Sequence, residues 1–135
     1  MIRIILLGKV VPKARPRFSS RGHRGHVHLP PKYAEWKESA VIDLMNTKFV
    51  AIGKISLEIT FINAIRGNAD CDNAAGSIMD ALVKSGVLCG DSAATIGKLV
   101  VENYQEKKPK IKPQTLIVIN SNYKANIDEI REFLV

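Results

Sequence analysis

The first 34 residues of this chain contain no aspartate and no glutamate. They hold eight lysines and arginines, whereas the rest of the chain, with 12 basic and 13 acidic residues, has a formal charge of −1. A surplus of positive charge confined to one end is typical of a protein that binds a polyanion, and nucleic acid is favoured over an anionic membrane surface. A charge that served solubility alone would explain the total of +7 but not this asymmetry.

Cysteine is scarce as well. The only two, Cys71 and Cys89, exclude a disulfide framework, and we expect both thiols to be reduced. A zinc site built from them and His23, His26 or His28 is an alternative, but the chain has no CxxC and no HxxxH spacing, which disfavours it.

Long hydrophobic runs are also missing. The apolar start, MIRIILLGKVV, is interrupted by Arg3 and Lys9 and is too short to cross a bilayer. It has no small-residue cleavage site, so we interpret it as a strand and not as a signal peptide, and we expect a cytoplasmic protein. With 46% hydrophobic and 24% charged residues, the 135 residues fit one globular domain, at a size where a dimer partner would add stability.

Hydrophobic periodicity predicts an α/β (α+β) fold, in which helices pack on a mixed β-sheet. We expect a basic arm or loop without regular structure over residues 12–31, which is rich in proline and glycine. The predicted strands cover residues 2–11, 54–62, 94–106 and 113–122, and the predicted helices cover 32–49, the segment from about 72 to Gly86, and 126–135.

Two aspartates precede the middle helix, in the stretch NADCDNAAGSIMDAL. If the backbone between Asp70 and Asp72 is extended, their carboxylates point the same way and can reach one hard divalent cation. Alternatively, Asp72 or Asn73 caps the helix and Asp70 favours the positive end of its dipole. The stretch is not an EF-hand loop, because Ala74 and Ala81 occupy ligand positions of that loop.

Other polar residues are less informative alone. Asp91, in LCGDSA, reads by itself as an ordinary turn residue. The histidines of GHRGHVH are more typical of phosphate contacts in a basic loop than of a general base.

Three stretches in this order resemble the RusA family of Holliday junction resolvases, which are small endonucleases associated with phages and prophages. GKVVPKARPRFSSRG is similar to the family's P-x-x-RPR segment, DCDNAAGSIMDAL to its D-x-D-N-x-x-K-x-x-x-D-A-L motif, and SGVLCGDSAATI to its glycine–apolar–apolar–x-D-D segment. The resemblance runs from roughly Gly8 to Glu106 and covers most of the chain.

The resemblance implies a homodimeric endodeoxyribonuclease that uses Mg²⁺, or Mn²⁺, and makes paired symmetric nicks in four-way junction DNA. Asp70, Asp72 and Asp91 match the family's metal-binding catalytic acids, and we expect them to meet in space. Asn73 and Asp80 match positions of the family's helix. For contacts with DNA phosphates we expect the basic residues of the arm, which are Lys13, Arg15, Arg17, Arg21 and Arg24. We expect neither a membrane nor a small-molecule substrate.

Two positions depart from the family pattern. Gly76 stands where the family usually has a lysine, one turn after Asp72, and Gly90 stands where it often has another aspartate. A lysine side chain there could hold the scissile phosphate, whereas a glycine has no side chain to do so, and it costs a helix about 1 kcal/mol relative to alanine. Lys84 or Lys98 are alternative sources of the missing charge.

Two rival functions follow from these departures. One is a junction-binding protein of the same fold with weak or no cleavage, and the other is a basic interaction protein whose aspartates are only caps. For the dimer interface, the helix that contains Trp36 and the strand over 54–62 are both candidates.

Overall fold

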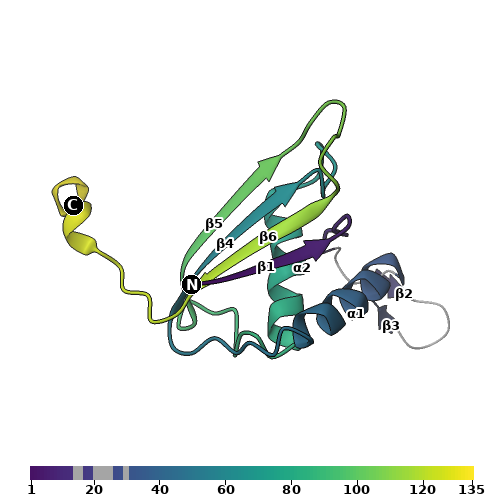
Figure 1. Cartoon of the computed structure of the whole chain (residues 1–135). Helices are drawn as coiled ribbons and strands as arrows, with labels where there is room; N and C mark the ends of the chain where they lie inside the picture. The colour runs from purple at the N-terminus through teal and green to yellow at the C-terminus, as the bar shows by residue number, and fades with distance from the viewer. Residues whose placement is uncertain (14–16, 20–25, 29–30) are drawn as a thin grey trace.

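The computed structural model has a four-stranded sheet at its centre, with the two long helices on one side of it (Figure 1). It describes residues 1–13, 17–19, 26–28 and 31–135. The sheet contains β1 (Ile2–Leu7), β4 (Ile55–Ile62), β5 (Ile96–Tyr104) and β6 (Gln114–Asn120), in the order β1-β6-β4-β5, and the helices are α1 (Pro31–Met45) and α2 (Cys71–Lys84). The predicted fold class is therefore confirmed. In the described ranges, no helix combines the length and the apolar character that crossing a bilayer requires.

The central strand β4 fixes the hydrophobic core. It pairs antiparallel with β6 and parallel with β5. The strand predicted over residues 54–62 is confirmed, and its residues alternate: Ile55, Leu57, Ile59 and Phe61 are fully buried whereas Glu58 faces solvent. Since a one-residue slip would expose this whole apolar row, the register is strongly determined. Because this apolar row is already buried within one chain, it cannot form the dimer interface.

A helical crossover joins the parallel pair, as parallel strands require. α2 leaves the end of β4, runs back across the sheet and ends before β5 begins (Figure 1). Its apolar face is buried and includes Ala74, Ile78 and Leu82, whereas Met79 is only half-buried. The helix ends at Lys84, and Gly86 follows with a φ of +87°, a conformation that favours glycine.

Two predicted segments differ from the structure. The arm was predicted to lack regular structure, but it contains the short antiparallel pair β2 (Arg17–Ser19) and β3 (His26–His28). The chain was predicted to end in a helix over residues 126–135, but it forms only two 3₁₀ turns, η1 (Ile127–Glu129) and η2 (Arg131–Phe133). The residues of both turns are exposed, so no packed face stabilises an α-helix there.

A polar cluster fixes the connection between β5 and β6. The side-chain amide of Asn63 donates to Glu106 Oε1 at 3.0 Å and to the carbonyl oxygen of Ile111 at 3.0 Å, and Glu106 Oε1 also accepts from the backbone N–H groups of Ile111 and Lys110. These donors, the N–H of Ile111 first, lower the pKa of the Glu106 carboxyl. The cluster holds this loop against the end of β4.

Candidate active site

Asp70 occupies the N-cap position of α2, where the sequence had placed Asp72 or Asn73. Its backbone is extended, with φ −74° and ψ 124°, but its side chain makes no capping hydrogen bond. The carboxylate instead accepts a long hydrogen bond of 3.4 Å from the side-chain amide of Asn73. Capping therefore does not account for the Asp70 carboxylate, which remains available for another partner.

Asp72 lies in the first turn of α2 and is exposed. The backbone is extended only at Asp70, because Cys71 is already helical. In the part of the chain that the structure describes, no lysine, arginine or histidine lies within ion-pair distance of Asp70 or Asp72. Two exposed carboxylates at the positive end of a helix offer the hard oxygen ligands that Mg²⁺ accepts while it keeps several waters.

Asp91 lies at the other end of α2. It sits in the loop before β5, where the N–H of Thr95 donates to the carbonyl of Ser92 and the N–H of Ile55 donates to the carbonyl of Thr95. These contacts place the loop at the start of β4, whereas Asp70 follows its end (Figure 1). A helix as long as α2 separates the two regions by about 21 Å.

One chain therefore does not gather the three aspartates, contrary to our expectation. Across residues 1–13, 17–19, 26–28 and 31–135, no three His, Cys, Asp or Glu side chains are placed to hold a metal ion together. The reason is topological, because the helix of a crossover runs back from one end of the parallel strands to the other, so the loops before and after it lie at opposite ends of those strands. That Asp91 is a metal ligand stays a prediction.

Among the described residues, Lys13 forms an ion pair with a side chain of α2. Its ammonium lies 3.2 Å from Asp80 Oδ2, and the hydroxyl of Tyr33 donates to the same oxygen at 2.8 Å. The backbone N–H of Lys13 donates to the carbonyl of Asn73 at 3.2 Å, which fixes this end of the arm against the first turns of the helix. No local pattern predicts this ion pair, because its partners are 67 residues apart.

The side chain of Lys13 runs over Gly76. A Cβ built on Gly76 would lie 3.7 Å from Lys13 Cδ, which is an ordinary van der Waals contact. The two lysines suggested by the sequence lie elsewhere, since Lys84 is in the last turn of α2 and Lys98 is near the start of β5. Lys13 therefore places a positive charge on the face of α2 where Gly76 leaves space.

The environment of Tyr33 leads to a prediction about alkaline pH. Burial, and then the hydrogen bond and the negative charge of Asp80, raise the pKa of Tyr33 well above its ordinary value of about 10. Below pH 10 both the folded and the unfolded chain keep the Tyr33 proton. Above pH 10 the unfolded chain loses this proton, whereas the folded chain keeps it. Stability should therefore fall as the pH rises above about 10.

Urea unfolding of the wild type and of Tyr33→Phe at pH 9 and pH 11 measures this effect. We expect a steeper loss of stability in the wild type, because the two proteins differ only in the Tyr33 hydroxyl. Equal losses of stability in the two proteins would show that burial and Asp80 do not raise the pKa of Tyr33.

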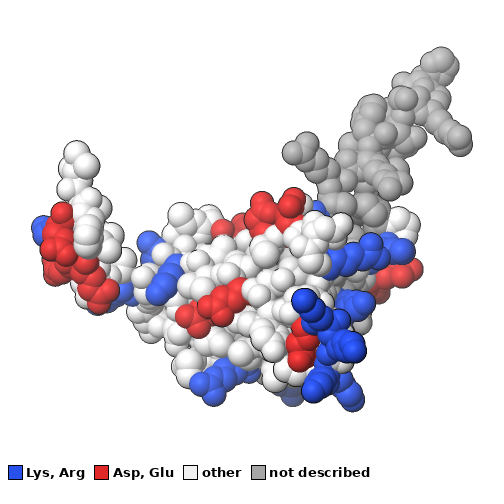
Figure 2. Space-filling model, turned by 90° about the horizontal axis from the view of Figure 1, so that it is seen from above, with Lys and Arg blue, Asp and Glu red and all other residues white. Residues whose placement is uncertain are grey.

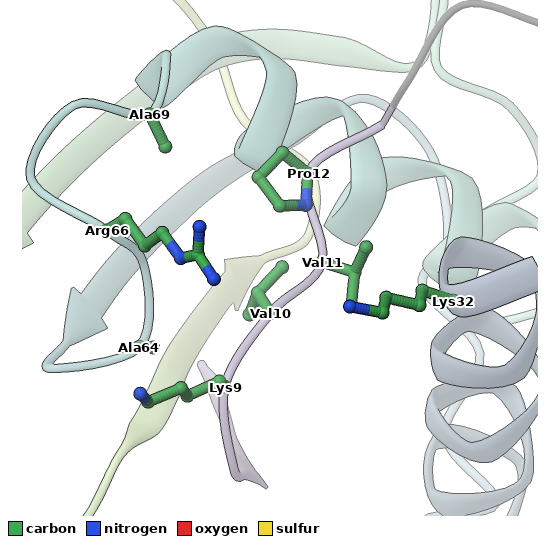
Figure 3. A pocket seen from close by; sticks show the side chains of 8 residues that line it. All are labelled: Lys9, Val10, Val11, Pro12, Lys32, Ala64, Arg66 and Ala69. Carbon is green, nitrogen blue, oxygen red and sulfur yellow. The ribbon is translucent and has the colours of Figure 1, made fainter. Parts of the chain in front are cut away.

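A hollow of about 420 Å³ lies beside the start of α2. Figure 3 shows its lining, which combines apolar side chains with three basic ones and comes from Lys9, Val10, Val11, Pro12, Lys32, Ala64, Arg66 and Ala69. Seen from above, lysine and arginine side chains gather at one end of the molecule around a small acidic patch (Figure 2). This charge distribution fits a polyanionic substrate.

The remaining predicted DNA contacts lie in the arm. Arg15, Arg21 and Arg24 fall outside the described residues, and Arg17 begins β2. Their contacts with phosphates stay predictions. The two cysteines are free and exposed, and α2 lies between them, so they do not form a zinc site together.

Comparison with known proteins gives two matches. The model of the family described as endodeoxyribonuclease RusA matches residues 8–114. The chain is also 33% identical, over 93 residues, to the crossover junction endodeoxyribonuclease RusA of Aquifex aeolicus (strain VF5), and this match covers 67% of the chain and 72% of that protein.

Proposed function

Because the chain belongs to the RusA family of Holliday junction endodeoxyribonucleases, we propose that it resolves four-way DNA junctions with Mg²⁺, by two symmetric nicks. The proposed site is chosen because of the position of the Asp70 carboxylate. It stands at the N-cap of α2 without capping it, beside the exposed Asp72 and without a basic partner in the described residues.

Asp70 and Asp72 are the proposed metal ligands from one chain. Their oxygens suit Mg²⁺ or Mn²⁺, and both carboxylates reach solvent, from which the DNA backbone approaches. A divalent ion bound there supplies Lewis-acid activation of a water and of the scissile phosphate. Without a cation, the carboxylates would repel the phosphate that they have to meet.

A second copy of the chain supplies Asp91 in this proposal. A two-fold axis that crosses α2 near its middle brings the start of this helix in one copy close to its end in the other. Asp91 of each copy then lies beside Asp70 and Asp72 of its partner. Two equal composite sites result, which suits a junction with approximate two-fold symmetry.

Lys13 supplies a positive charge to the same site. Asp80, which accepts a hydrogen bond from Tyr33, pairs with its ammonium, and its stem lies over Gly76. Nearly half of its side chain is exposed, so its ammonium can still donate to a phosphate oxygen. Such a donor stabilises the negative charge that develops during cleavage. This arrangement supports cleavage over the rival proposal that the chain binds junctions but cannot cut them because residue 76 is a glycine.

Cleavage of a labelled four-way junction tests the proposal. The wild type should nick it in Mg²⁺, should lose all cleavage in EDTA, and should leave a linear duplex of the same sequence uncut. Asp72→Asn should bind the junction with near-normal affinity but cut it about 10²–10³-fold more slowly.

Binding without any cleavage in Mg²⁺ or Mn²⁺ would favour the rival binding protein. Equal affinity for the junction and the duplex, with no effect of metal, would favour a basic interaction protein whose aspartates have no catalytic role.

A further inference from the structure

The hollow beside α2 is built on a fixed floor. The backbone N–H of Val10 donates to the carbonyl of Ala64 at 2.9 Å, and the hydroxyl of Ser77 donates to the carbonyl of Val11 at 2.7 Å. These bonds tie the segment after β1 both to the loop after β4 and to α2. Val10 and Ala64 are buried, so the apolar floor exists before any ligand arrives.

Three cations and no acid surround this floor, from Lys9, Lys32 and Arg66. In Figure 3 the side chains of Lys32 and Arg66 extend toward each other from opposite sides of Val10 and Pro12. No carboxylate of the described residues pairs with any of the three. A hollow with an apolar floor and a cationic rim has the chemistry to receive an anion that carries an apolar body.

The rim is coupled to the catalytic carboxylates. The N–H of Ala69 donates to the carbonyl of Arg66 at 3.0 Å, which closes a turn, and Asp70 is the next residue along the chain. Because Ala69 also lines the hollow, the hollow adjoins the residue that carries the Asp70 carboxylate.

We propose that this hollow is a nucleotide subsite, which takes one unpaired deoxynucleotide from the branch point of the junction. The three cations hold its phosphate, and Val10, Val11 and Pro12 receive its sugar and base. A volume of about 420 Å³ is in the range of small-molecule sites. A nucleotide stacked inside a duplex cannot enter, whereas one at a branch point has less stacking to lose. This inference rests on the proposed function, because it names how that substrate is held.

Fluorescence of 2-aminopurine tests the subsite. The base is placed, one position at a time, at each branch nucleotide of a junction that cannot migrate, and also in a duplex arm as a control. Asp72→Asn in the full chain is titrated to saturation, so that neither cutting nor affinity affects the signal. At one branch position we expect the fluorescence to rise about threefold or more, because the base leaves its stack for a site without aromatic residues.

Two further variants locate the signal. Adding Lys32→Ala and Arg66→Ala should abolish the rise at saturation, whereas adding Lys107→Ala and Lys108→Ala, two exposed lysines of the connection between β5 and β6 that do not line the hollow, should preserve it. Thermal melts of both variants establish that they are folded.

A flat signal at every branch position would overturn the subsite, and so would an equal rise in the variant without Lys32 and Arg66. Metal-dependent cleavage by the wild type with flat fluorescence would overturn the subsite alone. A fluorescence rise without cleavage by the wild type would overturn the proposed nuclease instead.

Discussion

An equimolar mixture of Asp72→Asn and Asp91→Asn protein should cut a four-way junction at a readily measured rate, although each variant alone should cut it about 10²–10³-fold more slowly than the wild type. In the proposed dimer each site combines Asp70 and Asp72 of one copy with Asp91 of the other. A mixed dimer therefore collects both substitutions in one site and leaves the other site intact. Random exchange of subunits makes half of the dimers mixed, so about a quarter of the sites should be active.

Analysis of the cleavage products gives a second test of the composite site. A mixed dimer has one active site, so it should release singly nicked junctions and not the paired nicks of the wild type. The matched control is a mixture of Asp70→Asn and Asp72→Asn, whose mixed dimers carry one substitution in each site and should stay inactive. Subunits are exchanged by joint refolding, and two different affinity tags show that mixed dimers form.

An inactive mixture of demonstrated mixed dimers would show that Asp91 does not complete the partner's site. Activity of the control mixture would show that cutting does not need both Asp70 and Asp72. In either case the composite site would be wrong, while membership of the family would stand.

Replacing Lys13 with methionine should lower the cleavage rate about 10²–10³-fold, and adding Gly76→Lys to the same chain should restore most of it. Methionine keeps an apolar stem over the helix but removes the ammonium. A lysine at residue 76 starts from the backbone position that the stem of Lys13 now covers, so it can bring its ammonium to the same region. Single-turnover rates at saturating junction separate this effect from binding.

Gly76→Ala is the control both for the loss caused by Lys13→Met and for the rescue by Gly76→Lys. With Lys13 present, its Cβ meets Lys13 Cδ at an ordinary 3.7 Å, so cleavage should be unchanged. The helix should gain about 1 kcal/mol from the loss of a glycine. With Lys13→Met, Gly76→Ala should restore nothing, because it adds no charge. Full activity of Lys13→Met, or equal rescue by alanine and lysine, would exclude a catalytic role for this ammonium.

Local sequence patterns predicted the helices and strands that bury one face and expose the other. The alternation of β4 and the periodic apolar residues of α2 are such cases, because each pattern reports a single buried face. The ends of the chain were harder to predict. The C-terminal segment has helical periodicity but nothing to pack against, and β2 and β3 are too short to stand out in a basic, proline-rich arm.

The sequence by itself determined the family, the basic end of the chain and the presence of the carboxylates, because these depend on which residues occur and in what order. Only the tertiary structure decided that Asp91 lies a helix length from Asp70, and that Lys13 covers Gly76 and reaches Asp80. The direction of the crossover and contacts between distant segments fix these positions. Neither leaves a periodic signal in the chain, because both arise only when the sheet has assembled and α2 has packed on it.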